Sequence, residues 1–311
     1  MKLVLTGGSG LLAINWAYKM RNKADVYLFT HLHDVNMSQV ISRRVDLSEQ
    51  ESIKEVLTDW RPDMVIHTAG MTNVDGCEKD PKEARIANVK IARQVAAVAH
   101  ELDLKLVHIS TDHLFDGNKP LVSEEEPPAP LNVYGKTKLE AEIQVLDVCP
   151  DALVVRTNFY GWGHPDRTSF TDWIINSLQR GESIPAFYDV FFSPVLIDHL
   201  IIAVHGLVEM GVSGIIHVAG DQRISKYDFA LTVADIFSLD KQLIEKASIK
   251  KAKLLAPRPL DMSLSNQKAV SLLGRKIGNV EGGLQGLFEQ LQQGRPQELA
   301  LAICQSDLRG T

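Results

Sequence analysis

The sequence has few of the features that mark secreted, membrane and metal-binding proteins. Its 311 residues include three cysteines, Cys77, Cys149 and Cys304, an odd set without the spacing of a metal site. Such sparse cysteine usage indicates a reduced, cytoplasmic setting rather than a disulfide framework, and we expect no metal centre. No apolar run reaches the roughly 18 residues that a membrane-spanning helix needs, so no membrane association is expected.

An excess of positive charge is also missing. Lysine and arginine number 33 against 39 acidic residues, a net charge of −6, and the two signs are interleaved along the chain. Because phosphate backbones are bound by a concentrated basic face, we expect no nucleic-acid partner. What is present is an ordinary globular composition, 45% hydrophobic and 23% charged, in a chain long enough for one large α/β domain or two fused lobes.

A strand, a glycine-rich turn and a helix open the chain. Residues 2–6 form a compact apolar strand, residues 7–10 read Gly-Gly-Ser-Gly, and residues 11–20 have a helical pattern. The small residues of this G-x-x-G-x-x-A arrangement let the backbone turn tightly and approach a pyrophosphate at the helix N-terminus. Its place between a first strand and a first helix favours a dinucleotide site over a plain turn. The expected cofactor contacts here are Gly7, Ser9, Gly10 and Leu11.

The second strand, residues 25–29, indicates which dinucleotide is bound. An acid about 20 residues after the glycine turn usually holds the ribose of NAD, but here Thr30-His31-Leu32-His33 precede the first acid, Asp34. This leaves room for a 2′-phosphate that Arg43 or Arg44 would pair with bidentately, which favours NADP, with NAD as the alternative. That both arginines are simply solvated is an equally good interpretation. Further cofactor contacts are expected from Thr30, Arg43, Asp46, Leu47, Ala69 and Gly70.

Strands alternate with helices throughout residues 1–156, which predicts a Rossmann-type, doubly wound parallel sheet with helices on both faces. Ligands of such sheets lie beyond the carboxyl ends of the strands, where the glycine turn, Ala69-Gly70 and Thr111 all fall. We therefore expect a dinucleotide-binding domain at 1–156, to which 193–219 return. Residues 157–192 and 220–311 are expected to form a smaller α/β substrate-binding lobe.

Several local patterns carry structural expectations. The third strand is expected to end at Val45-Asp46-Leu47, and Ser48 to Glu51 predict a capping box for the next helix. His67 lies in an apolar strand and is interpreted as a packing residue. Asn88 lies on a buried helical stripe, where a buried amide needs partners and is expected to tie neighbouring strands together.

The stretch from Leu106 to Glu142 carries the expected chemistry. A buried strand delivers Thr111 to the sheet edge, and a later helix carries Tyr134 and Lys138, four residues apart and so on one face. We expect the ammonium of Lys138 to lower the pKa of Tyr134 from about 10 towards neutrality, and Thr111 to hydrogen-bond the oxygen that Tyr134 protonates. An isolated Y-x-x-x-K pair is more often a packing tyrosine beside a solvated lysine, so the interpretation depends on the dinucleotide site.

Taken together, TGGSGLLA, ISTDHLFDG and YGKTK resemble the extended short-chain dehydrogenase/reductases. Within these the chain is most similar to the dTDP-4-dehydrorhamnose reductase family. The narrowing segments are VIHTAGMTNVDGCEKDP, EEPPAPLNVYGKTKLEAE, VRTNFYGWG, GIIHVAGDQRISKYDFA and RPLDMSLSNQKA, which extend the resemblance from residue 2 to about residue 272. Two departures are Ala13, which replaces the usual third glycine, and a short loop after Arg156, which the resemblance implies to line the substrate pocket.

The resemblance implies roles for individual residues. Tyr134 is implied to be the proton donor, Lys138 to hold the nicotinamide ribose, Thr111 to bind the reacting carbonyl, and the turn at Gly7 and Gly10 to bind pyrophosphate. A nucleotide-linked sugar is the implied substrate. The expected substrate contacts are Thr72, Thr111, Asn158, Phe159 and Arg258.

These observations favour an NAD(P)H-dependent oxidoreductase of deoxysugar biosynthesis that reduces a nucleotide-linked 4-keto-6-deoxysugar at C4. A nucleotide-sugar epimerase with the same Tyr and Lys is an alternative. A 4,6-dehydratase is disfavoured because Asp112-His113 stands where an Asp-Glu pair is needed. A third alternative is a non-catalytic dinucleotide-binding subunit, similar to the regulator of methionine adenosyltransferase. Whether the chain forms a homodimer is left open.

Overall fold

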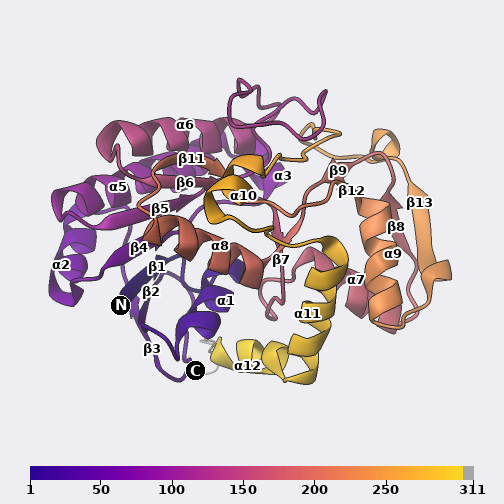
Figure 1. The fold of residues 1–311 in the computed structure, drawn as a ribbon, viewed down its shortest axis with the longest axis horizontal. Helices are drawn as coiled ribbons and strands as arrows, with labels where there is room; N and C mark the ends of the chain where they lie inside the picture. Colours follow the sequence, from indigo (N-terminus) through magenta and orange to yellow (C-terminus); the bar gives the residue numbers. More distant parts are fainter. Residues whose placement is uncertain (304–311) are drawn as a thin grey trace.

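The computed structural model describes residues 1–303 and has a seven-stranded sheet at its centre (Figure 1). Its strands run parallel in the order β11-β6-β5-β4-β1-β2-β3. The order reverses between β1 and β4, which is where such sheets bind ligands. The predicted doubly wound α/β fold is confirmed. The strands are β1 Lys2–Thr6, β2 Asp25–Thr30, β3 Val40–Arg44, β4 Met64–His67, β5 Lys105–Ile109, β6 Leu153–Arg156 and β11 Gly214–His217.

Successive side chains of each strand enter two different cores. Leu3 and Leu5 are fully buried with Trp16 on one face of the sheet, while Val4 is buried with Ile53 on the other. This alternation follows from the two-residue repeat of a strand, and both faces are apolar because helices cover both. One face packs against α1 Leu11–Met20 and α8 Ile197–Glu209, the other against α2 Gln50–Trp60, α5 Ile91–Glu101 and α6 Val133–Val148.

Three short ladders lie outside the main sheet, and the part built on α7, α9, β8 and β13 stands to the right in Figure 1. Phe229 of α9 is fully buried there, with its ring against those of Tyr160, Phe170 and Phe192. The elements are β7 Phe159–Tyr160 with β10 Val195–Leu196, β9 Phe191–Phe192 with β12 Ile224–Ser225, β8 Ile184–Phe187 with β13 Ile244–Ala247, and the helices α7 Phe170–Gln179, α9 Lys226–Ile236 and α11 Val280–Gln292.

The remaining helices are short, and the last of them, α12, contacts α1. Arg295 of α12 is buried, and its guanidinium donates to Asp198 Oδ1 at 2.8 Å and to the carbonyl of Asn15 at 3.2 Å. This contact anchors the end of the described chain to α1 and α8. The short helices are α3 Val74–Lys79, α4 Pro81–Arg85, the π-helix η1 Ile86–Lys90, the 3-10 helices η2 Lys241–Leu243 and η3 Ile249–Lys251, α10 Gln267–Leu273 and α12 Arg295–Ala302.

Two local expectations about the segment after β3 are wrong in detail. Strand β3 ends at Arg44, before the predicted Val45-Asp46-Leu47. The predicted capping box is absent, because Ser48 donates its amide and its hydroxyl to Asp46 Oδ1 at 2.8 and 2.7 Å, and α2 begins after Glu49 without a side-chain cap.

Asn88 does not tie strands together. Its side chain accepts from the amide of Met71 at 2.7 Å and donates to Thr137 Oγ1 at 3.0 Å. It therefore joins the loop after β4 to α6, the helix that carries Tyr134. The expectation that this buried amide has partners holds, but the elements it connects were misidentified.

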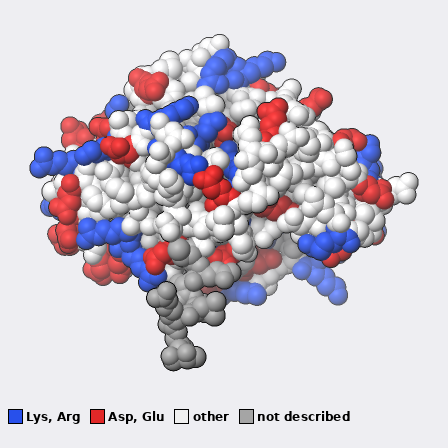
Figure 2. Space-filling view, turned by 90° about the horizontal axis from the view of Figure 1, so that it is seen from below, with Lys and Arg blue, Asp and Glu red and all other residues white. Residues whose placement is uncertain are grey.

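The surface of the protein mixes charges of both signs. On the face shown in Figure 2, acidic and basic side chains lie interspersed rather than in one basic stripe. Within the described residues, no helix is both long and apolar enough to cross a bilayer.

Candidate active site

The glycine turn lies against the end of β4. Gly7 has a φ of +66°, and a Cβ at this position would lie 2.9 Å from Cα of Ala69. Gly8 donates its amide to the carbonyl of Phe29 at 2.8 Å, and Gly10, the N-cap of α1, donates to the carbonyl of Gly7 at 2.7 Å. A side chain at Gly7 would meet both strain and a clash. The structure thus brings Gly7 next to Ala69, while Gly10 and Leu11 form the start of α1 and the carbonyl of Ser9 lies against His164.

Ala13, the departure from the usual glycine, is fully buried in the core that contains Leu3 and Leu5. A methyl group at this position is accommodated between α1 and the sheet. The close helix-to-strand packing that a third glycine normally allows is therefore retained with alanine.

Some of the residues expected to bind the adenosine part of the cofactor already have partners within the protein, and others do not. Arg44 donates from Nε and Nη2 to the two carboxylate oxygens of Asp34 at 2.7 and 2.9 Å. Arg43 reaches Glu55 with a single bond of 3.4 Å and is exposed. Thr30 is buried, and its Oγ1 has no partner among the described residues. Arg43 and Thr30 are therefore the better placed to receive a ligand, whereas Asp46 is occupied by Ser48 and Leu47 is half-buried.

Thr111, Tyr134 and Lys138 are all buried. Thr111 follows β5, and Tyr134 and Lys138 lie in the first two turns of α6, whose N-cap Asn132 accepts from the amide of Gly135 at 2.8 Å. A Cβ at Gly135 would lie 2.3 Å from the carbonyl oxygen of His113, so the helix start packs closely on the segment after Thr111. The His113 ring meets the Tyr134 ring edge-on, with centroids 5.5 Å apart.

The expected effect of Lys138 on Tyr134 is wrong in this structure. Burial raises the pKa of Tyr134 to about 12, and the hydrogen bond from Thr111, which favours the phenolate, only partly opposes it. Burial also lowers the pKa of Lys138 to about 8, against the attraction of Glu142. The ammonium of Lys138 donates to the carbonyl of Ile109 at 2.7 Å, a contact that no spacing rule predicts.

Two buried histidines lie beside Lys138. Nζ of Lys138 is 3.4 Å from Nε2 of His108, and the His108 ring stacks on that of His67 at 5.3 Å. His67 Nδ1 lies 2.8 Å from Thr6 Oγ1, and burial followed by the charge of Lys138 lowers the pKa of His67 to about 3. The expectation that His67 is a core residue agrees with its burial.

The expected substrate residues differ in how strongly the protein holds them. Asn158 donates to Asp112, and Phe159 is half-buried in β7. Arg258 is bound to Asp75 Oδ1 at 2.9 Å and to the carbonyl of Ala256 at 2.8 Å, so its charge is already partly compensated. Thr72 is exposed.

Sequence reasoning missed a cation, Lys226, whose charge disfavours protonation of His113. Lys226 is partly buried at the first position of α9, and its Nζ lies 3.4 Å from the centroid of the Phe192 ring. A lysine in the first turn of a helix interacts unfavourably with the helix dipole. This unfavourable position is the feature of the sequence that could have drawn attention to Lys226.

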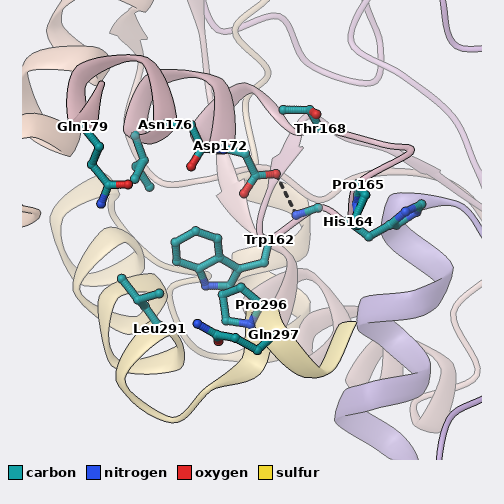
Figure 3. Close-up of a pocket in the computed structure, with 12 residues that line it drawn as sticks. Trp162, His164, Pro165, Thr168, Asp172, Asn176, Gln179, Leu291, Pro296 and Gln297 are labelled. Carbon is teal, nitrogen blue, oxygen red and sulfur yellow. Dashed lines mark hydrogen bonds between the residues drawn. The ribbon is translucent and has the colours of Figure 1, made fainter. Parts of the chain in front are cut away.

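The cavity shown in Figure 3 does not lie at the predicted site residues. It has a volume of about 400 Å³ and lies between α7, the loop before it and the helices α11 and α12. Asp172 accepts from the amide of Gly163 there at 2.8 Å, and Trp162 forms part of the wall. None of the predicted site residues lines it, although His164 Nε2 lies 2.9 Å from the carbonyl oxygen of Ser9. Because the buried titratable groups gather at Tyr134 instead, we place the candidate active site there.

Comparison with known proteins gives a consistent result. Residues 1–293 match the family model of the RmlD substrate binding domain. A probable low-salt glycan biosynthesis reductase, Agl14, of Haloferax volcanii is 31% identical over 288 residues, which cover 91% of this chain and 92% of that protein. The crystal structure of dTDP-4-dehydrorhamnose reductase from Bacillus anthracis in complex with NADP is 25% identical, with a TM-score of 0.83, over 93% of this chain and 99% of the other.

A subunit of a different enzyme is among the relatives as well. Methionine adenosyltransferase 2 subunit beta of Danio rerio is 26% identical over 285 residues, which cover 89% of this chain and 86% of that protein. Overall likeness therefore does not separate a reductase from a methionine adenosyltransferase subunit, and the residues of the site must do so.

Proposed function

The chain belongs to the family of the RmlD substrate binding domain, and from this premise we propose that it is an NADP-dependent reductase of a nucleotide-linked 4-keto-6-deoxysugar. In this proposal a hydride is added to C4 of the sugar and Tyr134 protonates the oxygen. The observation that carries it is the burial of Thr111, Tyr134 and Lys138 together at the carboxyl edge of the sheet.

The residues present fit a dinucleotide. Gly7 has no side chain that would keep a pyrophosphate away from its backbone, and Gly10 is the N-cap of α1, whose N-terminal amides favour an anion. The unpartnered hydroxyl of Thr30 and the exposed guanidinium of Arg43 are the groups proposed for the adenosine ribose and its 2′-phosphate. When bound, the nicotinamide supplies the hydride.

The raised pKa of Tyr134 suits a proton donor. At about 12 it keeps the phenol protonated at neutral pH, so the proton is available as negative charge develops on the sugar oxygen. Lys138, with a pKa of about 8, is still mainly charged near pH 7 and is proposed to hold the nicotinamide ribose. Thr111 is proposed to hold the same oxygen through its hydroxyl.

The test is Tyr134→Phe, with Tyr188→Phe as the control at an exposed tyrosine. We expect the first substitution to lower kcat by roughly 100-fold or more with NADPH affinity retained, and the second to leave both unchanged. NADPH oxidation with a panel of nucleotide 4-keto sugars and a separate NADPH titration measure the two quantities. Equal loss of turnover and of NADPH binding in Tyr134→Phe would contradict the assigned role.

The zebrafish relative favours a second candidate, a dinucleotide-binding regulatory subunit. A protein that oxidises no NADPH with any 4-keto sugar nucleotide, yet co-purifies with a methionine adenosyltransferase, supports this candidate. An epimerase would convert its substrate without net NADPH oxidation, so the same assay separates it as well.

Three further parts of the proposal concern the protein as a whole. We propose the division into a dinucleotide-binding domain at 1–156 with 193–219, and a substrate-binding lobe at 157–192 and from 220 onward. A cytoplasmic location agrees with the free thiols of Cys77 and Cys149. A homodimer is proposed, to be tested by sedimentation.

A further inference from the structure

His164 contacts the glycine turn from outside the main sheet. It lies in the loop between β7 and α7, and its Nε2 is 2.9 Å from the carbonyl oxygen of Ser9. In Figure 3 its ring points toward α1. A carbonyl oxygen only accepts hydrogen bonds, so Nε2 carries the ring proton and donates it. The contact joins two segments that are far apart in the sequence, the loop after β7 and the turn before α1.

The ring of His164 makes this contact in its neutral form. The residue is only 6% exposed, and burial is the main cause that lowers its pKa. Its Nδ1 is buried and has no partner within residues 1–303. In that part of the chain the bond to Ser9 is therefore the hydrogen bond that the ring makes, and it determines which nitrogen holds the proton.

The peptide between Ser9 and Gly10 is held at both ends. His164 binds its carbonyl, and its N–H, which belongs to Gly10, donates to the carbonyl of Gly7 at 2.7 Å. In α1 the amide of Ile14 donates to the carbonyl of Gly10 at 3.0 Å. The amides that precede it in α1 have no acceptor one turn back in the helix, so they are available to an anion. The orientation of this peptide therefore sets the direction of those amides.

The glycines of the turn do not fix this orientation by themselves. Gly7, Gly8 and Gly10 have no Cβ and offer little resistance to rotation of the peptides between them. Backbone bonds restrain part of the turn, such as that from Gly8 to the carbonyl of Phe29 at 2.8 Å. The bond from His164 adds a restraint from a side chain, which a substitution can remove. A turn that is already ordered loses less entropy when it binds a ligand.

The loop that carries His164 is itself closed by hydrogen bonds. Asp172 Oδ2 accepts from the amides of Gly163 and Ser169, both at 2.8 Å. The amide of Arg167 donates to the carbonyl of His164 at 2.9 Å. The backbone on both sides of His164 is therefore held in place, and so is the origin of its side chain.

A second bond attaches the same loop to α1 at a different place. The side chain of Asn15 is buried, and its Nδ2 donates to the carbonyl of Trp162 at 2.7 Å and to that of Leu11 at 2.9 Å. This contact anchors the loop to the helix without touching the carbonyl of Ser9. Attachment of the loop thus has a contact of its own, whereas the bond from His164 acts on the turn.

We propose that His164 is a positioning residue for the cofactor, which fixes the peptide between Ser9 and Gly10 so that the amides at the start of α1 face the pyrophosphate. The inference rests on the proposed function, in which the turn binds the pyrophosphate. It deepens that function, because it makes a loop of the proposed substrate-binding lobe part of the cofactor site. A ligand that carries a pyrophosphate should depend on His164, and a ligand without one should not.

The test compares His164→Leu with the wild type by calorimetric titration of NADPH and of adenosine 2′-monophosphate, which has the ribose phosphate but no pyrophosphate. Leucine remains apolar and bulky but removes the donor. We expect NADPH to bind roughly tenfold more weakly, and adenosine 2′-monophosphate to bind as in the wild type. In turnover the KM for NADPH should rise while kcat at saturating NADPH is retained. His164→Gln keeps an N–H donor and should restore most of the NADPH affinity.

The matched control is His205→Leu. His205 also packs against α1, where its Nε2 accepts from Trp16 Nε1 at 3.1 Å, and it makes no contact with the glycine turn among the hydrogen bonds of the described residues. Its loss should lower the midpoint of thermal unfolding and leave both affinities unchanged. A histidine that only packs would behave in the same way. The inference is overturned if His164→Leu binds NADPH as the wild type does, or loses affinity equally for both ligands.

The titrations require no turnover, which keeps this inference separate from the proposed function. If the wild type reduces no 4-keto sugar, yet His164→Leu selectively weakens NADPH binding, the reductase proposal fails and the role of His164 stands. If the wild type turns over and His164→Leu keeps its NADPH affinity, the role of His164 alone is refuted. A wild type that binds no dinucleotide refutes both.

Discussion

Nζ of Lys138 lies 3.4 Å from Nε2 of His108, inside the sheet edge and away from water. Burial, followed by the charge of Lys138, holds the pKa of His108 well below its usual range, so the imidazole is neutral and accepts from the ammonium. With the carbonyl of Ile109, this gives Lys138 two acceptors from β5. The strand below the site thus helps to keep the lysine charged.

The first prediction concerns His108→Leu. Loss of a neutral acceptor disfavours the ammonium, so the pKa of Lys138 should fall further below about 8. The alkaline limb of the kcat profile should shift to lower pH, and activity should drop more at alkaline than at mildly acidic pH. A pH series of NADPH oxidation measures this.

The comparison variant is His108→Gln, which keeps an acceptor and should retain most of the alkaline limb. A uniform loss at every pH in His108→Leu would indicate a packing role and contradict the electrostatic one.

The second prediction concerns acid stability. The pKa of His67 is about 3 in the folded protein, against about 6.5 when unfolded. Between these values the unfolded chain binds a proton that the folded protein does not, so His67 lowers stability progressively as the pH falls from about 6.5 towards 3. One such group contributes a slope of up to about 1.4 kcal/mol per pH unit.

Replacing His67 by leucine should remove that share of the slope, whatever it does to absolute stability. Urea unfolding at a series of pH values gives the number of protons taken up on unfolding. An unchanged slope in the variant would show that His67 is not the group responsible.

The third prediction separates strain from contact at two glycines. Gly7 and Gly211 have similar φ values of +66° and +69°, but a Cβ at Gly7 would lie 2.9 Å from Cα of Ala69, whereas nothing lies within 4 Å at Gly211. Gly211→Ala should cost about 1 kcal/mol of unfolding free energy and leave NADPH binding unchanged. Gly7→Ala should cost more and should also weaken NADPH binding by about tenfold or more.

Thermal unfolding and NADPH titration of both variants provide the measurement. If Gly7→Ala binds NADPH as tightly as Gly211→Ala does, the turn at Gly7 is not the pyrophosphate site.

The fourth prediction concerns the 2′-phosphate. Arg44 is held by Asp34 through both Nε and Nη2, whereas Arg43 has one long contact with Glu55. Arg43→Ala should weaken NADPH binding by about tenfold and leave NADH binding unchanged, because hydrogen bonds to charged groups are among the strong ones. Arg44→Ala is the control and should have the smaller effect. The opposite ranking in a titration of both cofactors would assign the phosphate to Arg44.

Some of the structure could be predicted from local sequence patterns. Asp80 caps α4 by accepting from the amide of Glu83 at 3.0 Å, and Ser225 caps α9, since Asp and Ser are among the residues preferred at a helix N-cap. Ser48 shows the limit of such rules. It matches a capping box, but Asp46 competes for its amide and hydroxyl, so the nearer partner decides.

The sequence by itself determined the repeat of strand and helix, the small residues of the turn at Gly7, and the four-residue spacing that puts Tyr134 and Lys138 on one face of a helix. These features depend on neighbours along the chain, and the preferences of the backbone are local. Only the tertiary structure decided the direction in which the pKa of Tyr134 shifts and the pairing of Arg44 with Asp34. Burial and charge act through space, and the residues that bury or face a group lie far from it in the chain.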